Sequence, residues 1–430
     1  MPPASGSLAG RMTVHYTGPG MTMPQDGTWE GIGQWYDVLA HDRIVATPDI
    51  AAKATELTQG KTDFYDKAEA IGEFVQKQIR YFVIEMGVGG YQPHPADDIF
   101  RGRYGDCKDK ATLLSAMLSS VGIHSALLMV DTERGVIDPD APSIMGNHMI
   151  GAIEIPAGYK SPKLRSVVTA KTGKRYLIFD PTWEVTPFGQ LEDNLQGSYG
   201  ILMEGSSSQV IQLPVLSPEL NTLRRSASFK LDADGTLKGT VTEKRFGDLS
   251  EDTRELFTRG DAKQQQQYMD RAVAQDFAAV SLTELKAENV DTLNKDMTTS
   301  FAISAAHFAT TAGPLLMVRP RVMGSLALPV DHKKRKVDID LEETMQASDD
   351  YDIEIPPGYV VDELPDPVKL DMGFASYESS TVVEGKMLHY KRTYTLREVT
   401  LPAEKYPELQ KLAGAIENDE QGRAVLKKSP

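Results

Sequence analysis

The sequence predicts an α+β fold in which a helix packs on an antiparallel sheet and a β-sandwich-type domain with helical insertions follows. Apolar residues recur with a helical period through residues 107–120, which is typical of an amphipathic helix. Three short apolar runs then come at 125–130, 148–155 and 175–179, and each ends in turn residues, as strands do. From about Leu216 onward, alternating segments separated by turn signals favour a β-rich second half.

The length of the chain sets its domain organisation. At 430 residues it exceeds what one hydrophobic core normally holds, so we expect more than one domain. Residues 1–47 carry several glycines and little periodicity, and this segment is too short to form a core of its own. We place a mixed domain at 48–215 and the β-rich domain at 216–430, with a subdivision near Leu316.

The first half contains three predicted helices ahead of its strands. Residues 49–59 and 64–80 form the first two, and a loop rich in Gly and Pro, 87–95, separates them from the third at 107–120. Gly122 marks the end of the third helix, because glycine accepts the left-handed conformation that follows many helices. Helices therefore come first and antiparallel strands after them.

The second half begins with a predicted hairpin around Asp234-Gly235, since Asp-Gly is a frequent hairpin turn. Helical stretches interrupt the strands at about 249–258 and 262–277, and a terminal amphipathic helix is predicted at 402–417. Further strands are predicted at 337–345, 351–355 and 387–396.

The charge balance argues against two classes of partner. The 46 Lys and Arg residues are outnumbered by 61 Asp and Glu residues, which gives a net charge of −15. Nucleic acids and anionic membranes both require clustered positive charge, so we exclude both as main partners. No segment is long and apolar enough to be a transmembrane helix.

The chain has a single cysteine, Cys107. One cysteine forms neither an intrachain disulfide nor a Cys-based zinc site. Neither His-x-x-x-His nor Glu-x-x-His occurs, so we predict no metal and no other cofactor. A lone cysteine is either an incidental buried residue or one kept for its reactivity, and its surroundings decide between the two.

Cys107 stands at a loop-to-helix junction, after Gly105 and Asp106. Free backbone N–H groups and the helix dipole favour a thiolate there, but an imidazole is needed to form an ion pair with it. His148, at the start of a predicted strand, is our candidate for that base. Asp180, at the end of the next apolar run, would hold the imidazole in one tautomer and stabilise its cation. Neighbouring antiparallel strands would present His148 and Asp180 side by side.

Three local patterns around these residues resemble the transglutaminase-like superfamily. They are Tyr-Gly-Asp-Cys-Lys-Asp-Lys-Ala at 104–111, Asn-His-Met at 147–149 and Phe-Asp-Pro-Thr-Trp at 179–183. The resemblance covers roughly residues 51–200, and the sequence looks most similar to bacterial cell-envelope members in which β-sandwich domains flank this core. It implies a papain-like core for the domain at 48–215.

The resemblance implies a role for each of the three residues. Cys107 matches the nucleophile, His148 the general base and acid, and Asp180 the orienting carboxylate. It also implies an oxyanion donor on the loop before the nucleophile, for which Gln92 is our candidate together with the Cys107 backbone N–H. Further residues expected at the site are Tyr91 and Tyr104, as alternative donors, and Asp106 and Trp183, as neighbours, with Trp183 packing beside it.

The chemistry implied by the resemblance is acyl transfer from an amide through a thioester on Cys107. Family members include transglutaminases, peptidases and amidases. The sequence lacks the calcium sites of the eukaryotic enzymes, which favours hydrolysis of a protein or peptide over cross-linking. The alternative hypothesis is a non-catalytic envelope protein that binds or assembles through this core and the β-sandwich.

The resemblance to envelope proteins also implies an exported protein, periplasmic or extracellular. Residues 1–10 lack the apolar core of a signal peptide, so a cytoplasmic location is the alternative. Envelope members usually begin with a β-sandwich domain, and we therefore interpret 1–47 as the remnant of a truncated β domain.

The other histidines are expected to play no part in the chemistry. His94 lies between prolines in the loop near the expected substrate groove, and His124 follows the end of a helix. No acidic or thiol partner stands at a recognisable spacing from His15, His41, His307, His332 and His389.

Overall fold

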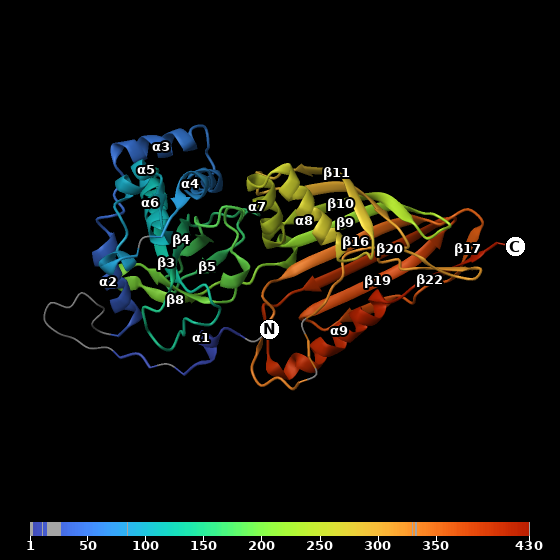
Figure 1. Ribbon diagram of the computed structural model, residues 1–430. Helices are drawn as coiled ribbons and strands as arrows, with labels where there is room; N and C mark the ends of the chain where they lie inside the picture. The colour runs from blue at the N-terminus through green and yellow to red at the C-terminus, as the bar shows by residue number, and fades with distance from the viewer. Residues whose placement is uncertain are drawn as a thin grey trace. The chain divides into compact units, whose positions relative to one another are not determined.

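The computed structural model divides into two compact units, the first ending at Leu216 and the second beginning at Ser217. Helices and a six-stranded sheet make up the first unit, whereas long strands dominate the second (Figure 1). The predicted α+β fold class, with a β-rich C-terminal part, is confirmed. The structure describes residues 3–10, 12–14, 27–83, 85–328, 330–331 and 333–429.

The sheet of the N-terminal unit is antiparallel, with its strands in the order β5-β6-β4-β3-β7-β8. The predicted strands at 125–130, 148–155 and 175–179 are confirmed as β3, β4 and β6. The other three strands, β5, β7 and β8, are short and were not predicted from the sequence. The six strands are β3 (Ser125–Val130), β4 (His148–Ile155), β5 (Val167–Thr169), β6 (Arg175–Phe179), β7 (Tyr199–Met203) and β8 (Gln209–Gln212).

Helix α6 (Cys107–Ser120) is the central helix of this unit, and its residues from Cys107 to Leu118 are all buried. Helices α3, α4 and α5 surround it, and its remaining side lies on β3 and β4. A side chain at Gly151 in β4 would come within 2.8 Å of Leu114 Cδ2, so this glycine lets α6 approach the sheet closely. The other elements are α1 (Ser5–Leu8), α3 (Pro48–Thr58), α4 (Phe64–Gln78), β1 (Arg80–Tyr81), α5 (Ala96–Gly102) and β2 (Tyr104–Gly105).

The segment interpreted from the sequence as the remnant of a β domain contains helices and no strand where the structure describes it. Residues 29–40 form α2 (Trp29–Ala40), and residues 3–10, 12–14 and 27–47 contain no strand. One face of α2, with Ile32 and Tyr36, is buried in the same apolar cluster as Met129 and Met149 of the sheet. The described part of the segment belongs to the N-terminal unit. The apolar period of α2 is helical, which explains why it forms a helix and not a strand. Residues 1–2, 11 and 15–26 lie outside the described residues.

The C-terminal unit contains an eight-stranded sheet in the order β11-β12-β10-β9-β16-β20-β19-β18 and a four-stranded sheet in the order β13-β14-β22-β17. Because β9 and β16 are parallel neighbours, strands from before and after Leu316 share the larger sheet. The larger sheet is therefore continuous across the predicted subdivision near Leu316, which stays a prediction. The helices are α7 (Glu251–Arg259), α8 (Ala262–Ala274) and α9 (Tyr406–Glu420). The strands are β9 (Thr222–Leu231), β10 (Leu237–Phe246), β11 (Val280–Glu288), β12 (Met297–Ala305), β13 (Thr310–Ala312), β14 (Leu315–Val318), β15 (Ile339–Asp340), β16 (Met345–Glu354), β17 (Tyr359–Glu363), β18 (Val368–Asp371), β19 (Ala375–Glu384), β20 (Met387–Leu396), β21 (Thr400–Leu401) and β22 (Ala424–Lys428).

The core of this unit lies between the eight-stranded sheet and the elements that cover it. Side chains of β14, β22 and α8 pack with those of β9, β10 and β12 in one cluster. Helix α9 packs on β19 and β20 in a second cluster, and Figure 1 shows it alongside these strands. The smaller sheet and helices α8 and α9 thus pack against the larger sheet, whereas a simple β-sandwich pairs two sheets alone.

Local predictions in this unit fare unevenly. The Asp234-Gly235 turn joins β9 and β10, and Gly235 has a φ of 86° that favours glycine. The predicted strand at 337–345 is wrong over most of its length, because β15 covers Ile339–Asp340 and β16 begins at Met345. Between them Glu342 has a φ of 70°, a left-handed conformation that interrupts a strand.

One histidine that lacks an acidic partner by sequence spacing has one in the structure. His389 Nδ1 lies 2.6 Å from Asp352 Oδ1, because β16 and β20 pair these two residues directly. Register between distant strands brings them together, and local spacing does not reveal it. His15 and His332 lie outside the described residues.

Five charged residues form a buried group in the C-terminal unit, which we call the C-terminal ion cluster. Arg225 lies between Glu243, at 3.1 Å, and Asp349, at 2.7 Å. Arg392 pairs with Asp349 and, at 3.1 Å, with Glu420. These pairs tie the large sheet to the end of α9. Among the described residues no helix combines the length and apolar character that crossing a bilayer needs.

Candidate active site

Cys107 is the first residue of α6, where backbone N–H groups have no partner within the helix. A capping box fixes this end: Asp106 accepts from the Asp109 N–H, and Asp109 accepts from the Asp106 N–H, both at 3.3 Å. An acidic N-cap residue followed three residues later by a second acid resembles the capping-box pattern that marks a helix N-terminus. This sequence pattern could have predicted the two hydrogen bonds between Asp106 and Asp109. The Asp109 carboxylate also accepts from the His94 N–H at 2.8 Å and lies 3.0 Å from its Nδ1. His94 is therefore a loop residue that helps to fix the helix end.

The two lysines next to the nucleophile are buried and already engaged. Lys108 pairs with Asp106. Lys110 has no exposed surface, and its ammonium donates to two backbone carbonyls at the end of α4, at 3.1 and 2.7 Å. Burial lowers the pKa of Lys110 to about 8, although nearby carboxylates oppose this. Both lysines hold the fold together around the thiol, rather than standing free to attract a substrate.

His148 and Asp180 come from two neighbouring strands. His148 begins β4, Asp180 follows the last residue of β6, and these strands pair directly. His148 Nε2 lies 2.6 Å from Asp180 Oδ2. The other oxygen, Oδ1, accepts from the backbone N–H and from the hydroxyl of Thr182, both at 2.7 Å. Thr182 therefore fixes the carboxylate in the orientation that holds the imidazole.

Cys107 acts on the same imidazole. It is one of the groups that raise the pKa of His148, and because Asp180 engages Nε2, Nδ1 is the ring nitrogen left to face the sulfur. Burial opposes a charged imidazole, but Asp180 and Cys107 raise the pKa of His148 well above its usual value. Burial also acts to raise the pKa of Asp180, yet His148 and Thr182 bring it below its usual range. The site is thus suited to a thiolate, an imidazolium and a carboxylate in series.

Gln92, the predicted oxyanion donor, is hydrogen-bonded to helix α2. Its Nε2 donates to the backbone carbonyl of Leu39 at 3.2 Å. The alternative donor Tyr91 packs edge-on against Trp35, with ring centroids 5.4 Å apart. Both residues fasten their loop to α2, and a role of either in binding an oxyanion stays a prediction.

The other predicted neighbours lie at the surface of the unit. Tyr104, in β2, is 44% exposed. Trp183, expected to pack beside the site, is 50% exposed. Its backbone carbonyl accepts a hydrogen bond from Gln76 Nε2 at 2.6 Å.

Two tyrosines whose hydroxyls respond to the charge of Cys107 are not among the site residues predicted from the sequence. Tyr81 in β1 pairs with Gly105 in β2, and burial, followed by the negative charge of Cys107, raises the pKa of its hydroxyl. Tyr36 belongs to the apolar cluster that contains Cys107, and its pKa is raised by the same two causes. The helical period of α2 is the signal that could have identified Tyr36.

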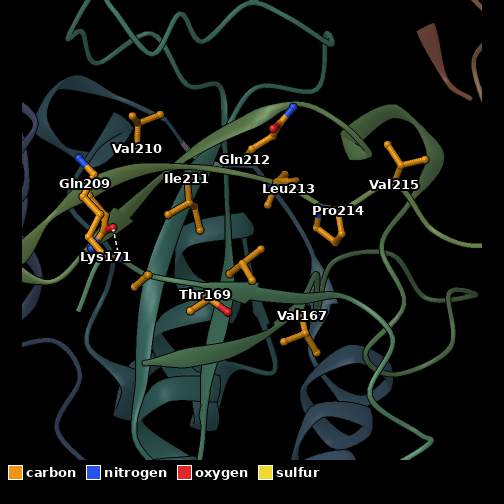
Figure 2. Close-up of a pocket in the computed structure, with 12 residues that line it drawn as sticks. Val167, Thr169, Lys171, Gln209, Val210, Ile211, Gln212, Leu213, Pro214 and Val215 are labelled. Atoms are coloured by element: carbon orange, nitrogen blue, oxygen red, sulfur yellow. Dashed lines mark hydrogen bonds between the residues drawn. The ribbon is translucent and has the colours of Figure 1, made fainter. Parts of the chain in front are cut away.

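A separate cavity of about 600 Å³ lies between the two edge strands of the N-terminal sheet, β5 and β8 (Figure 2). At one end the Lys171 N–H donates to Gln209 Oε1 at 2.8 Å. None of Cys107, His148 and Asp180 lines this cavity. It is therefore distinct from the thiol site. Within the described residues, no cluster of three or more His, Cys, Asp or Glu side chains is arranged to hold a metal ion.

Comparisons with known proteins concern the family and the fold of the chain. Residues 315–426 match the family described as "Domain of Unknown Function with solved-structure structure (DUF3858)". The fold is similar to the crystal structure of a putative protease from Parabacteroides distasonis ATCC 8503, with a TM-score of 0.51 and 14% sequence identity. That similarity covers 92% of this chain and 58% of the other, so this chain spans little more than half of that protein. No curated protein matches the chain.

A second family model matches part of the N-terminal unit. The family model of the transglutaminase-like superfamily matches residues 51–176. This range includes Cys107 and His148 and ends just before Asp180. Residues 51–176 thus form a domain of the transglutaminase-like superfamily.

Proposed function

We propose that the protein is a cysteine-dependent enzyme that hydrolyses amide bonds of protein or peptide substrates through a thioester on Cys107. The observation that carries the proposal is the hydrogen bond between His148 and Asp180, together with a cysteine at a helix N-terminus that raises the pKa of the same imidazole. The similarity in fold to a protein described as a putative protease supports the same class of reaction. We propose hydrolysis rather than cross-linking because the sequence resembles the superfamily but lacks the calcium sites of its eukaryotic enzymes.

The proposed reaction follows from the roles of the three side chains. The Cys107 thiolate attacks the amide carbonyl carbon, and the imidazolium of His148 gives its proton to the departing nitrogen. The N–H groups at the start of α6 face the charge that develops on the carbonyl oxygen. His148 then takes a proton from water, which attacks the thioester and releases the carboxylic acid and the thiol. Asp180 holds the imidazole in one orientation and stabilises its charged form.

Thiol labelling tests whether Cys107 is activated. Iodoacetamide should alkylate native Cys107 faster at neutral pH than the same thiol in the denatured chain, because only a thiolate reacts. His148→Ala should remove this advantage. His124→Ala is the matched control, since His124 is an exposed histidine of the same unit, and its labelling rate should equal that of the wild type. Equal rates in the native and denatured chains would favour the non-catalytic binding hypothesis.

A product assay then tests the type of acyl transfer. Peptide and protein substrates are incubated with the full chain, and release of new amino termini or ammonia is compared with incorporation of a fluorescent amine. We expect hydrolysis products in the wild type and none with Cys107→Ala. Dominant amine incorporation would replace hydrolysis with cross-linking. Identical results with both proteins would refute catalysis by Cys107.

A further inference from the structure

The two ends of the N-terminal sheet approach each other without pairing. β5 and β8 are the first and last strands in its order, yet both line the cavity of about 600 Å³ shown in Figure 2. A single side chain bridges them there, because Gln209 Oε1 accepts from the Lys171 N–H at 2.8 Å. The sheet therefore curls toward a barrel, and a gap stays open between its two edges.

The register of β8 shows which of its backbone groups face this gap. Leu213, just after the strand, donates its N–H to the Ser198 carbonyl on the side of β7. Backbone groups of residues two apart in a strand point to the same side, so those of Val210 and Gln212 point away from β7. Within the described part of the chain, no hydrogen bond engages the N–H groups of these two residues.

β5 presents its backbone to the gap in the same way. The Ser166 carbonyl accepts from the Ile178 N–H at 2.8 Å, on the side of β6. Val167 and Thr169 therefore direct their N–H and C=O groups to the opposite side, and their N–H groups have no partner among the described residues. A strand edge with free backbone groups is a template for a further strand, and here two such edges face one cavity.

The side chains around the cavity set the chemistry of an occupant. Val168, Ile211 and Leu213 line it and are buried, with exposed fractions of 6%, 7% and 2%. Figure 2 shows Ile211 directed into the cavity. Among the described lining residues Lys171 alone carries a charge, and it lies at the end that Gln209 closes. A fitting occupant is therefore apolar along its length and negative at one end.

The directions of the two edges favour an extended backbone as that occupant. Each strand of the sheet is antiparallel to its neighbours, so β5 and β8 run in opposite directions. A strand placed between them is antiparallel to one edge and parallel to the other. Its alternate residues direct their backbone groups to opposite sides, so each edge receives its own row of hydrogen bonds. A helix has no such free rows, because its backbone groups bond within the helix.

We propose that the gap between β5 and β8 binds an extended peptide segment of another protein, which completes the sheet by strand addition. The segment has apolar side chains facing Val168 and Ile211 and a carboxylate, from an acidic side chain or a chain end, near Lys171. Main-chain hydrogen bonds supply affinity in this mode of binding, and the side-chain contacts supply specificity. The cavity does not include Cys107, so the inference is independent of the proposed function.

A labelled hexapeptide of alternating valine and threonine tests the site on the full chain. Fluorescein is attached at its amino end, and three forms are compared: a free carboxyl end, an amidated end, and an amidated end preceded by aspartate. We expect saturable binding by fluorescence anisotropy, tightest for the two forms with a carboxylate. Hydrogen exchange followed by mass spectrometry should slow in both 166–172 and 208–215. Slower exchange in only one of these segments, or in neither, would overturn insertion between the two edges.

Methylation of the peptide nitrogens separates strand addition from apolar adsorption. Methylating either alternate set of amides should weaken binding by about tenfold or more, because each set supplies hydrogen bonds to one edge. A loss from only one set would show pairing with a single edge and contradict the proposal. Unchanged binding after both methylations would show that main-chain bonds play no part.

Two substitutions test the protein side. Lys171→Glu should weaken binding of the carboxylate forms by about twofold to fivefold and leave the amidated form unaffected. Lys160→Glu is the matched control, since Lys160 is an exposed lysine of the same unit outside the cavity lining, and it should behave as the wild type. Equal losses in both variants would refute a specific role of Lys171.

Gln212→Pro removes one N–H that faces the gap. Proline is tolerated where a strand edge directs its N–H outward, and Gln212 is exposed. We expect about fivefold weaker binding at an unchanged rate of Cys107 alkylation, which reports an intact unit. Wild-type affinity in this variant would overturn pairing at β8, and if the variant fails to fold, the methylated peptides decide. A chain that dimerises reversibly and is dissociated by the peptide would identify a second copy as the occupant and overturn the choice of another protein.

Discussion

The two units each bury charged side chains, but the two groups differ in the kinds of side chain that they combine. In the C-terminal ion cluster both arginines lie between two carboxylates. Burial acts to lower the pKa of Arg225 and Arg392, yet the charge of Asp349 raises both above their usual values. The thiol site instead combines Cys107 with His148 and Asp180, and the last two residues shift each other's pKa in opposite directions.

The difference separates a group of fixed charges from a group of coupled ones. Arginines between carboxylates stay charged at any ordinary pH, so they fix the fold and do little else. At the thiol site the protonation states of His148 and Asp180 depend on one another. Coupled titrating groups are typical of places where chemistry occurs. The predictions below break one of the two groups at a time.

The largest effect is expected from Asp180→Asn, on activity. The amide cannot stabilise an imidazolium, and it favours the wrong tautomer of His148. Loss of this carboxylate in comparable triads lowers catalysis by about 10⁴-fold, and we expect about 10³-fold or more in the hydrolysis assay. The matched control is Asp63→Asn, because Asp63 caps α4 through the Tyr65 N–H at 2.9 Å and Asn caps equally well. Comparable losses in both variants would contradict a specific role for Asp180.

Arg392→Met should produce the opposite pattern, a loss of stability without a loss of reactivity. Arg392 is 3% exposed, and its removal leaves buried carboxylates short of a partner. Breaking a buried ion pair costs about 3–5 kcal/mol, which we expect in the free energy of unfolding of the C-terminal unit, followed by denaturant titration. Lys391→Met is the control, because Lys391 is the sequence neighbour of Arg392 but is exposed. Its ammonium lies 3.4 Å from the Asp350 carboxylate. Changed alkylation of Cys107 in Arg392→Met would contradict the separation of the two groups.

The pH dependence of stability should reveal the coupled pair in the thiol site. The raised pKa of His148 gives stability that is complete below pH 6.5 and is lost as pH rises through that raised value. The lowered pKa of Asp180 gives stability that is present above pH 3.8 and is lost as pH falls through the lowered value. His148→Gln should therefore differ most from the wild type between these limits, in the free energy of unfolding of the N-terminal unit. A difference that stays constant from pH 4 to the alkaline range would refute this coupling.

Lys110 should give the free energy of unfolding a pH dependence of opposite sign to the one expected from His148. Its pKa falls from 10.5 to about 8 on burial, so the folded state holds fewer protons than the unfolded one between these values. Stability relative to Lys110→Met should then rise with pH in that window, by at most about 1.4 kcal/mol per unit. The variant should be less stable overall, because the carbonyls of Gln76 and Ile79 lose their donor. Parallel curves for the two proteins would show that Lys110 does not titrate there.

The sequence identifies the residues that carry local patterns and misses those that depend on distant packing. Cys107 and His148 could be found because each begins an element with a clear period. Tyr36 was missed because glycines interrupt α2, and glycine is a poor helix former. Complete burial of Lys110 contradicts the usual exposure of lysine, and the sequence shows no sign of the carbonyls that bind it. Such contacts arise when separate segments pack, so spacing alone cannot supply them.

The smallest effect is expected from Gln92→Leu, which tests the oxyanion role predicted from the resemblance. Removal of an oxyanion donor normally lowers the rate by about 10²–10³-fold. Because Gln92 Nε2 is engaged by the Leu39 carbonyl, we expect a loss below about tenfold in the rate of hydrolysis, with a modest fall in thermal midpoint as the loop loosens from α2. A loss of 10²-fold at unchanged stability would instead mean that the amide turns to the substrate during the reaction. In that case α2 would hold only the resting position of the Gln92 amide.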